Sequence, residues 1–222
     1  MIKRNAVTNI KIDEYVDRFK VEGENKIYSK ALFFDLEHYV YKKPICIGVF
    51  GCAYYDEETK NLKTTQYMIE NRKDSEEILK IAEEYFIKAK IKLKKEYIVT
   101  FSGNNDFTVV NYLFKKNNIN MEVNKEFKSI DLQKEYEKVT KKCVGLKNLE
   151  KVFEINRESE IISGSTLAKT FGKIVKDEEY SLRMPEEKKD KILLYNRQDV
   201  ESLFNMITTW NKYVKEVDDA EK

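Results

Sequence analysis

Apolar, β-branched and aromatic residues gather in three runs in the first third of the chain. The runs cover residues 31–36, 44–55 and 63–69, and a polar turn at residues 56–61 lies between the last two. Runs of this kind, bounded by turn residues, are typical of β-strands. Their close spacing predicts three antiparallel strands that follow one another in chain order.

From Asp74 onwards, apolar residues mostly recur every three or four positions, as on one face of an amphipathic helix. Two short buried runs interrupt this pattern, and they predict further strands at residues 97–101 and 127–130. The expected helical segments, the fifth of them capped by Ser165, cover residues 74–89, 106–114, 132–139, 146–153, 165–174 and 185–210. This order predicts an α/β fold with a central mixed five-stranded sheet flanked by helices.

A length of 222 residues suits one large domain or two small ones, and we expect residues 30–214 to form one main domain. Residues 1–29 are mixed and charged, and we expect an N-terminal arm with a short helix from Asp13 to Val21. Residues 215–222 are charged and predict a frayed C-terminal tail.

The composition excludes several classes of protein. Lys and Arg number 41 against 39 Asp and Glu, so no strongly basic coat is expected. With three cysteines, no Cys-x-x-Cys pair and a single histidine, a disulfide framework or a Cys/His zinc site is not expected. No segment has the apolar length of a signal peptide or membrane span. We therefore expect a soluble protein of a reducing cytoplasm, without a membrane partner.

Two carboxylates end the first predicted strand. Asp35 and Glu37 follow the apolar run and are two residues apart, so on a strand they share a face with Cα atoms ~6.6 Å apart. Carboxylates placed together at the end of a buried strand repel each other and lose hydration. Mg²⁺ or Mn²⁺ would offset both effects, because hard cations prefer oxygen ligands. The alternative is the beginning of a solvated loop.

Three later residues are further candidates for the same chemistry. Asp106 follows the strand at 97–101, and Tyr195 and Asp199 lie one turn apart on the last helix. Asp106, like Asp131 after the next strand, could instead cap a helix. Tyr195 could pack in the core while Asp199 faces solvent. The order of the elements lets Asp35, Glu37, Asp106 and Asp199 meet at one edge of the sheet.

Together these residues form a familiar pattern. The chain resembles the ribonuclease H-like superfamily, within it the DEDDy-type 3′–5′ exonucleases, and among these the YprB-type ribonuclease H-like domains. The resemblance covers about residues 30–210 and rests on Phe34-Asp35-Leu36-Glu37, on residues 100–106, on Tyr195-Asn196-Arg197-Gln198-Asp199, and on residues 146–150, 155–157 and 162–164. The chain departs from the family pattern at His38, where Thr is usual, at Ser102, where Asn is usual, and at Phe107, which follows the aspartate.

The resemblance implies hydrolysis of phosphodiester bonds by two metal ions, Mg²⁺ or Mn²⁺. Asp35 would bridge both ions, Glu37 and Asp199 would hold the ion that activates water, and Asp106 would serve the second ion. Tyr195 would orient the attacking water. The substrate would be nucleic acid with a free 3′ end, DNA or RNA, preferably single-stranded. Two alternatives stay open, namely a non-catalytic nucleic-acid-binding or assembly module and an endonuclease of the same fold.

Overall fold

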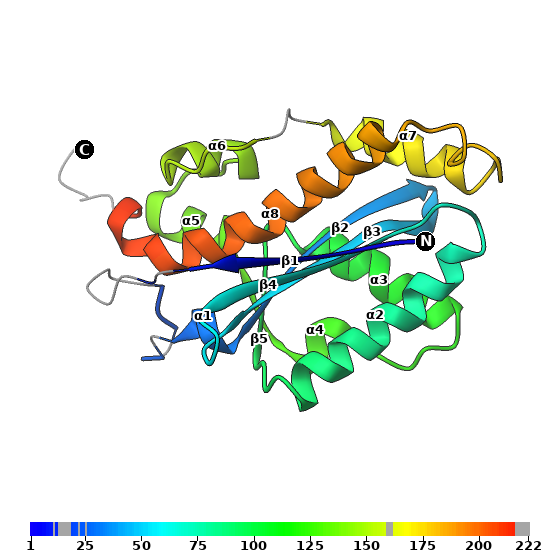
Figure 1. The fold of residues 1–222 in the computed structure, drawn as a ribbon. Helices are drawn as coiled ribbons and strands as arrows, with labels where there is room; N and C mark the ends of the chain where they lie inside the picture. The colour runs from blue at the N-terminus through cyan, green and yellow to red at the C-terminus, as the bar shows by residue number, and fades with distance from the viewer. Residues whose placement is uncertain (11, 13–18, 22, 25, 159–161, 216–222) are drawn as a thin grey trace.

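The structure is a computed structural model that describes residues 1–10, 12, 19–21, 23–24, 26–158 and 162–215 (Figure 1). Most of the helix expected from Asp13 to Val21 lies outside the described residues, as does all but the first residue of the expected tail at 215–222. The description therefore covers every strand and all but one of the helices predicted from the sequence.

One mixed sheet of six strands lies at the centre of the molecule, in the order β1-β4-β3-β2-β5-β6. The prediction of an α/β fold with a mixed sheet flanked by helices is confirmed. The strands in chain order are β1 (Ile2–Asn9), β2 (Ala31–Tyr41), β3 (Lys43–Asp56), β4 (Asn61–Met68), β5 (Tyr97–Thr100) and β6 (Lys128–Asp131).

The predicted number of five strands was wrong, because β1 adds a sixth at one edge. It pairs antiparallel with β4 from Ile2 opposite Met68 to Asn9 opposite Asn61. The side chains of β1 are mostly exposed and include Lys3 and Arg4. Charged residues are common on edge strands because they discourage pairing with other chains. The same charges hide the apolar pattern by which a strand is usually recognised.

The pairing of β2 differs on its two sides. It pairs antiparallel with β3 from Leu32 to Tyr41, with register irregularities after Glu37 and after Tyr39. Its parallel pairing with β5 is confined to residues 31–33, because β5 is only four residues long. From Phe34 to Tyr41, β2 therefore extends past the end of β5, and this extension carries the two carboxylates that the sequence singled out.

Helices cover both faces of the sheet (Figure 1). In chain order they are α1 (Ile27–Lys30), α2 (Asp74–Ile91), α3 (Asn104–Lys116), α4 (Val123–Glu126), α5 (Leu132–Thr140), α6 (Leu146–Val152), α7 (Gly164–Ile174) and α8 (Glu186–Tyr213). The long helix α8 crosses one face, and α2 and α3 lie on the other. The cap of α7 is Ser163 and not Ser165, since the Ser163 side chain accepts a hydrogen bond from the Thr166 amide.

Alternating side chains of β2 join the sheet to both helical layers. The ring of Phe33 packs against Phe204 of α8, with centroids 5.4 Å apart. The next residue, Phe34, packs against Phe86 of α2 at the same separation. All four side chains are almost fully buried. Because successive side chains of a strand face opposite sides, Asp35 and Glu37 follow Phe33 towards the layer of α8.

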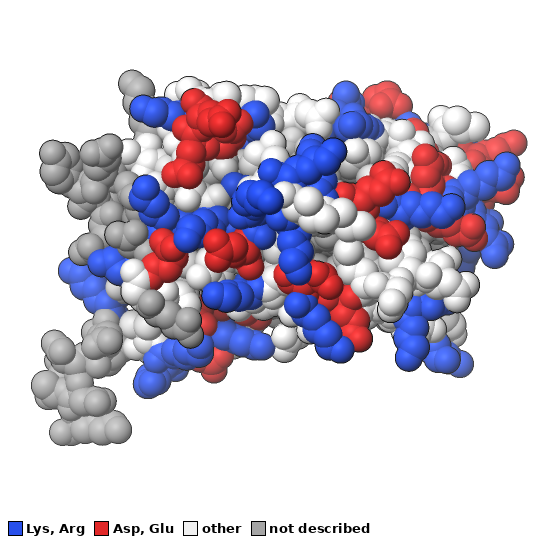
Figure 2. All heavy atoms as spheres, turned by 90° about the horizontal axis from the view of Figure 1, so that it is seen from below, with Lys and Arg blue, Asp and Glu red and all other residues white. Residues whose placement is uncertain are grey.

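Basic and acidic side chains lie interspersed on the surface shown in Figure 2. This distribution agrees with the near balance of charges in the sequence, a formal net charge of +2. Of the helices in the described part of the chain, none combines the length and the apolar composition that crossing a membrane requires.

Candidate metal centre

Three carboxylates converge between β2 and α8. Asp35 and Glu37 come from the extension of β2, and Asp199 comes from the middle of α8. One oxygen from each of them lies within 4.8 Å of the others. Asp199 is 6% exposed and Glu37 is 9% exposed, so the cluster is largely withdrawn from water. This spacing lets all three side chains contact one cation.

A polar residue in the apolar stripe of α8 holds Asp35 in place. Asn196 is fully buried, and its Nδ2 donates to Asp35 Oδ2 at 2.8 Å. Its Oδ1 accepts a hydrogen bond of 2.7 Å from Gln66 Nε2 of β4. The close approach of α8 requires a glycine opposite Asp35, because a Cβ at Gly51 would lie 2.1 Å from Asn196 Oδ1. The sheet is thus shaped to admit the residue that orients Asp35.

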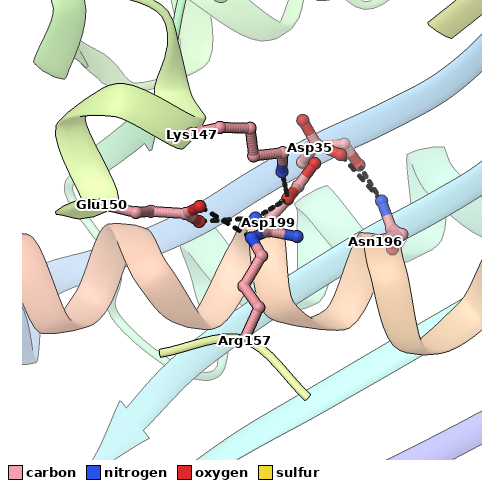
Figure 3. Close-up of polar contacts among 6 residues, drawn as sticks. All are labelled: Asp35, Lys147, Glu150, Arg157, Asn196 and Asp199. Atoms are coloured by element: carbon pink, nitrogen blue, oxygen red, sulfur yellow. Dashed lines mark hydrogen bonds and ion pairs between the residues drawn. The ribbon is translucent and has the colours of Figure 1, made fainter. Parts of the chain in front are cut away.

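Two cationic side chains, those of Lys147 and Arg157, contact Asp199 (Figure 3). Lys147 of α6 and Arg157, in the loop after α6, both donate to Asp199 Oδ1. Arg157 also donates from Nε to Glu150 Oε2 at 2.6 Å and from its NH2 group to Glu150 Oε1. This paired geometry fixes the guanidinium group between α6 and α8.

No role was predicted from the sequence for Lys147, Glu150, Arg157 or Asn196, although all four lie in stretches on which the resemblance rests. Two signals were present. Lys147 and Glu150 are three residues apart on one helix and therefore share a face. Asn196 occupies the apolar face of α8 between Leu193 and Val200. A buried polar side chain needs a partner, and here the partner is Asp35.

Tyr195 lies one helical turn before Asp199 and is 8% exposed. Lys147 Nζ lies 4.3 Å from the centroid of its ring, and the guanidinium carbon of Arg157 lies 5.3 Å away. Cations over an aromatic face are attracted by the ring quadrupole, so the ring has a fixed setting beside the carboxylates. Burial, followed by the charge of Asp199, raises the pKa of the Tyr195 hydroxyl, which keeps its proton.

Asp106 lies near the cluster but outside the group of three. It is the third residue of α3 and is 8% exposed, and no side chain caps that helix. Asp106 therefore does not take the alternative role of a helix cap. Asp131 does, because its Oδ1 accepts a hydrogen bond from the Gln133 amide at the start of α5.

An open cavity of about 400 Å³ connects the carboxylates with solvent. Asp35, Glu37 and Asp106 line it together with His38. The Nε2 atom of His38 accepts a hydrogen bond of 3.0 Å from Asn105 Nδ2 and lies 3.8 Å from Asp106 Oδ1. Burial lowers the pKa of His38, which favours the neutral ring that can accept this bond.

The electrostatics of the cluster favour a bound cation. Burial, with the charge of Asp199 added, raises the pKa of Asp35 to about 7. Burial and the charge of Asp35 also raise the pKa of Glu37 and of Asp106 well above the usual values. For Asp199, burial raises the pKa, but Lys147 and Arg157 oppose this change. Crowded carboxylates with raised pKa values gain most from a divalent cation, which replaces their repulsion by attraction.

The donor set therefore fits a hard divalent cation. Asp35, Glu37 and Asp199 supply oxygen ligands, and Asp106 faces the same cavity. A bound cation of this kind activates a water molecule as nucleophile and stabilises negative charge on a phosphoryl oxygen. No sulfur or imidazole ligand belongs to the group of three, so the set does not favour a soft metal.

The comparisons with known proteins agree with this arrangement. A family model described as the RNase H superfamily matches residues 32–211. Searches of curated proteins and of solved structures found no match for the chain. The matched segment includes the extension of β2, the beginning of α3 and the part of α8 that carries Tyr195 and Asp199. The mixed sheet between helical layers is consistent with a ribonuclease H-like fold. Since the match covers well over half of its length, the chain belongs to the RNase H superfamily.

Proposed function

We propose that this protein is a metal-dependent 3′–5′ exonuclease of the DEDDy type, most similar to the YprB-type domains, with residues 30–214 as its catalytic domain. One observation carries the proposal. Asp35, Glu37 and Asp199 share one cluster, and Tyr195 lies one turn before Asp199, in a chain of the RNase H superfamily. A tyrosine beside a carboxylate metal centre suits the orientation of an attacking water.

Each residue then has a distinct task. Asp35, Glu37 and Asp199 hold the metal, with Asp35 oriented by Asn196 and Asp199 oriented by Lys147 and Arg157. Asp106, which lines the same cavity, serves a second ion. The Tyr195 hydroxyl keeps its proton at neutral pH and donates a hydrogen bond that holds the water in line with the phosphorus atom. Two Mg²⁺ or Mn²⁺ ions are the cofactors that such oxygen ligands favour.

The substrate of the proposed reaction is nucleic acid with a free 3′ end. The carboxylates are largely buried, and the cavity that leads to them is about 400 Å³. A terminal nucleotide of a single strand can enter such a cavity, whereas a base pair within a duplex must first be opened. Single-stranded DNA or RNA is therefore the preferred substrate.

Degradation of labelled single strands tests the proposal. DNA and RNA oligonucleotides labelled at the 5′ or the 3′ end are incubated with the protein and Mn²⁺, and with chelator in place of Mn²⁺. The 3′ label should be released as a mononucleotide, while the 5′ label should move down a ladder of shortened products, only with metal. Asp35→Asn serves as the control for a contaminating nuclease. Cleavage of a closed circular strand would indicate an endonuclease, and no metal-dependent cleavage of any strand would indicate a non-catalytic module.

A further inference from the structure

The end of the hairpin between β2 and β3 exposes apolar and basic side chains next to the candidate metal centre. Val40, Tyr41 and Ile45 are 43%, 64% and 38% exposed. Lys42 and Lys43 between them are also exposed, and Lys42 turns the chain with a φ of 57°. We refer to these five residues as the hairpin tip. Single exposed apolar residues are ordinary on a protein surface, whereas neighbouring ones form a patch of the kind found at binding sites.

The hairpin tip adjoins the cavity of the candidate metal centre, because Val40 belongs to both. Val40 lines the cavity that contains Asp35 and Glu37, and Gly164 and Ala168 of α7 line it as well. Figure 1 shows the end of β2 beside α7. The pairing of β2 with β3 is irregular between Glu37 and His38 and between Tyr39 and Val40. At the ~3.3 Å rise of a strand, Tyr41 lies roughly 13 Å from Glu37 along β2. A nucleic-acid strand that has one end at the carboxylates and leaves the cavity past Val40 is therefore long enough to reach Tyr41 after a few nucleotides.

The charge of the hairpin tip indicates a polyanion. Residues 40–45 contain no acidic side chain. Among the described residues, no carboxylate forms an ion pair with Lys42 or Lys43. A third exposed lysine, Lys176 after α7, lies 5.8 Å from the ring of Tyr39, which precedes the tip on β2. Lys42 Nζ lies 5.8 Å from the centroid of the Tyr41 ring, so a cation and an aromatic ring lie together at the tip. Aromatic rings beside lysines that have no carboxylate partner are the features that bind single-stranded nucleic acid without regard to sequence.

A second copy of the chain suits the hairpin tip less well. A stable dimer buries about 800 Å² on each partner, from 20–30 residues. The tip offers three apolar side chains beside two uncompensated lysines, and in a symmetric contact the lysines of both copies would meet. A strand of nucleic acid needs only one ring for stacking and a few cations for its phosphates.

We propose that the hairpin tip binds the substrate strand on the 5′ side of its terminal nucleotide, with a base stacked on Tyr41 and phosphates on Lys42 and Lys43. This inference rests on the proposed function, because it takes the 3′ end to lie at the carboxylates. The distance of ~13 Å corresponds to about four nucleotides at the ~3.4 Å spacing of a stacked strand. A dinucleotide at this spacing should therefore be too short to reach Tyr41, and a 12-nucleotide strand should contact it.

Binding and turnover of strands of two lengths test the inference. The affinity of the protein for a fluorescent 12-nucleotide strand is measured by anisotropy in chelator, and kcat/KM is measured in Mn²⁺ for the 12-nucleotide strand and for a dinucleotide. Tyr41→Ala should weaken binding of the longer strand about 5- to 150-fold, the usual range for one stacked base. Its kcat/KM for the longer strand should fall, and that for the dinucleotide should stay as in the wild type.

Two matched variants separate stacking from a loss of apolar surface. Tyr41→Phe keeps the ring and should bind as the wild type does. Leu182→Ala removes another exposed apolar side chain, 83% exposed and outside the hairpin tip, and should also leave binding unchanged. Because Tyr41 is exposed, its alanine variant should keep the wild-type melting temperature, which shows that it is folded.

The possible results distinguish the hairpin tip from the proposed function. If the wild type degrades strands from the 3′ end but Tyr41→Ala binds and degrades the 12-nucleotide strand normally, the inference about the tip is wrong and the exonuclease stands. If no strand is degraded but Tyr41→Ala loses binding, the tip binds nucleic acid and the exonuclease proposal is wrong. A wild-type dimer that Tyr41→Ala converts to a monomer would make the tip a self-interface and overturn the inference.

Discussion

Replacement of Asp35 by asparagine should stabilise the metal-free protein, although it removes a residue proposed to be essential. Burial and the charge of Asp199 raise the pKa of Asp35 to about 7. A carboxyl group whose pKa is higher in the folded state than in the unfolded state prefers to fold with its proton bound. As the pH rises from about 4 through 7, the folded state must accept an unfavourable charge, and the free energy of unfolding falls. An asparagine carries no charge, and its side-chain oxygen can still accept the hydrogen bond from Asn196.

The magnitude follows from the difference between the two pKa values. A change from 3.8 to about 7 corresponds to about 4 kcal/mol at pH 8, because each pKa unit is worth 1.36 kcal/mol. The neighbouring carboxylates share the charge of the cluster and relax when Asp35 is replaced, so we expect about 2–4 kcal/mol. In a chain of this size, that gain raises the melting temperature by about 5–15 °C. The gain should be largest at pH 8 and should shrink towards pH 5.

Thermal unfolding in chelator between pH 5.5 and 8 measures this effect, and a second series contains millimolar Mn²⁺. Mn²⁺ should raise the melting temperature of the wild type, since it binds only the folded state, and should raise that of Asp35→Asn much less. Asp56→Asn is a control of opposite sign, because an ion pair with Lys63 lowers the pKa of Asp56 to about 2 and is lost in the variant. A metal-free Asp35→Asn protein that melts below the wild type at pH 8 would refute the electrostatic argument, and indifference of the wild type to Mn²⁺ would refute the metal centre.

Three further substitutions test separate parts of the site. Tyr195→Phe keeps the ring and removes the proposed hydrogen bond to water, so turnover should fall ~10²–10³-fold with an unchanged response of the melting temperature to Mn²⁺. An unchanged rate would make Tyr195 a packing residue. Glu150→Ala leaves the buried Arg157 without its main partner and should lower the free energy of unfolding in urea by about 3 kcal/mol. Its control, Glu179→Ala, breaks an exposed ion pair with Arg183 and should change that free energy little. Equal losses of stability in the two variants would contradict the structure. Gly51→Ala places a methyl group against Asn196 and should lower both stability and activity, while wild-type values would show that α8 has room to move.

Local patterns in the sequence were sufficient to predict most of the sheet and to place together two of the three residues of the carboxylate cluster. Asp35 and Glu37 were predicted to share a face because strand side chains alternate, and they do lie together. Asp199 was expected near them from the order of the elements and from the resemblance to the ribonuclease H-like superfamily. Edge strand β1 was missed because its exposed, charged residues lack an apolar pattern. A strand is recognised in a sequence by the apolar residues that it buries, and the edge strand β1 buries few side chains.

The cations around Asp199 could not be derived from local patterns. Arg157 reaches Asp199 because the loop after α6 returns over α8, and no periodicity specifies the path of such a loop. Lys147 lies at the beginning of a short helix and has the same appearance in the sequence as many solvated lysines. Their roles depend on contacts between segments that are 42 and 52 residues from Asp199 along the chain. Such contacts are a property of the folded chain as a whole.

The division of the carboxylates between β2 and α8 also has a consequence for biosynthesis. A ribosome delivers Asp35 and Glu37 early and Asp199 only when about nine tenths of these 222 residues have been made. Docking of α8 buries Phe204 against Phe33 and brings Asp199 to the other carboxylates in the same event. A chain that is still growing, or that has lost its last helix, therefore has no complete ligand set. For the nuclease activity proposed above, this order of assembly means that the set of carboxylate ligands is completed only after α8 has been synthesised and has packed on the sheet.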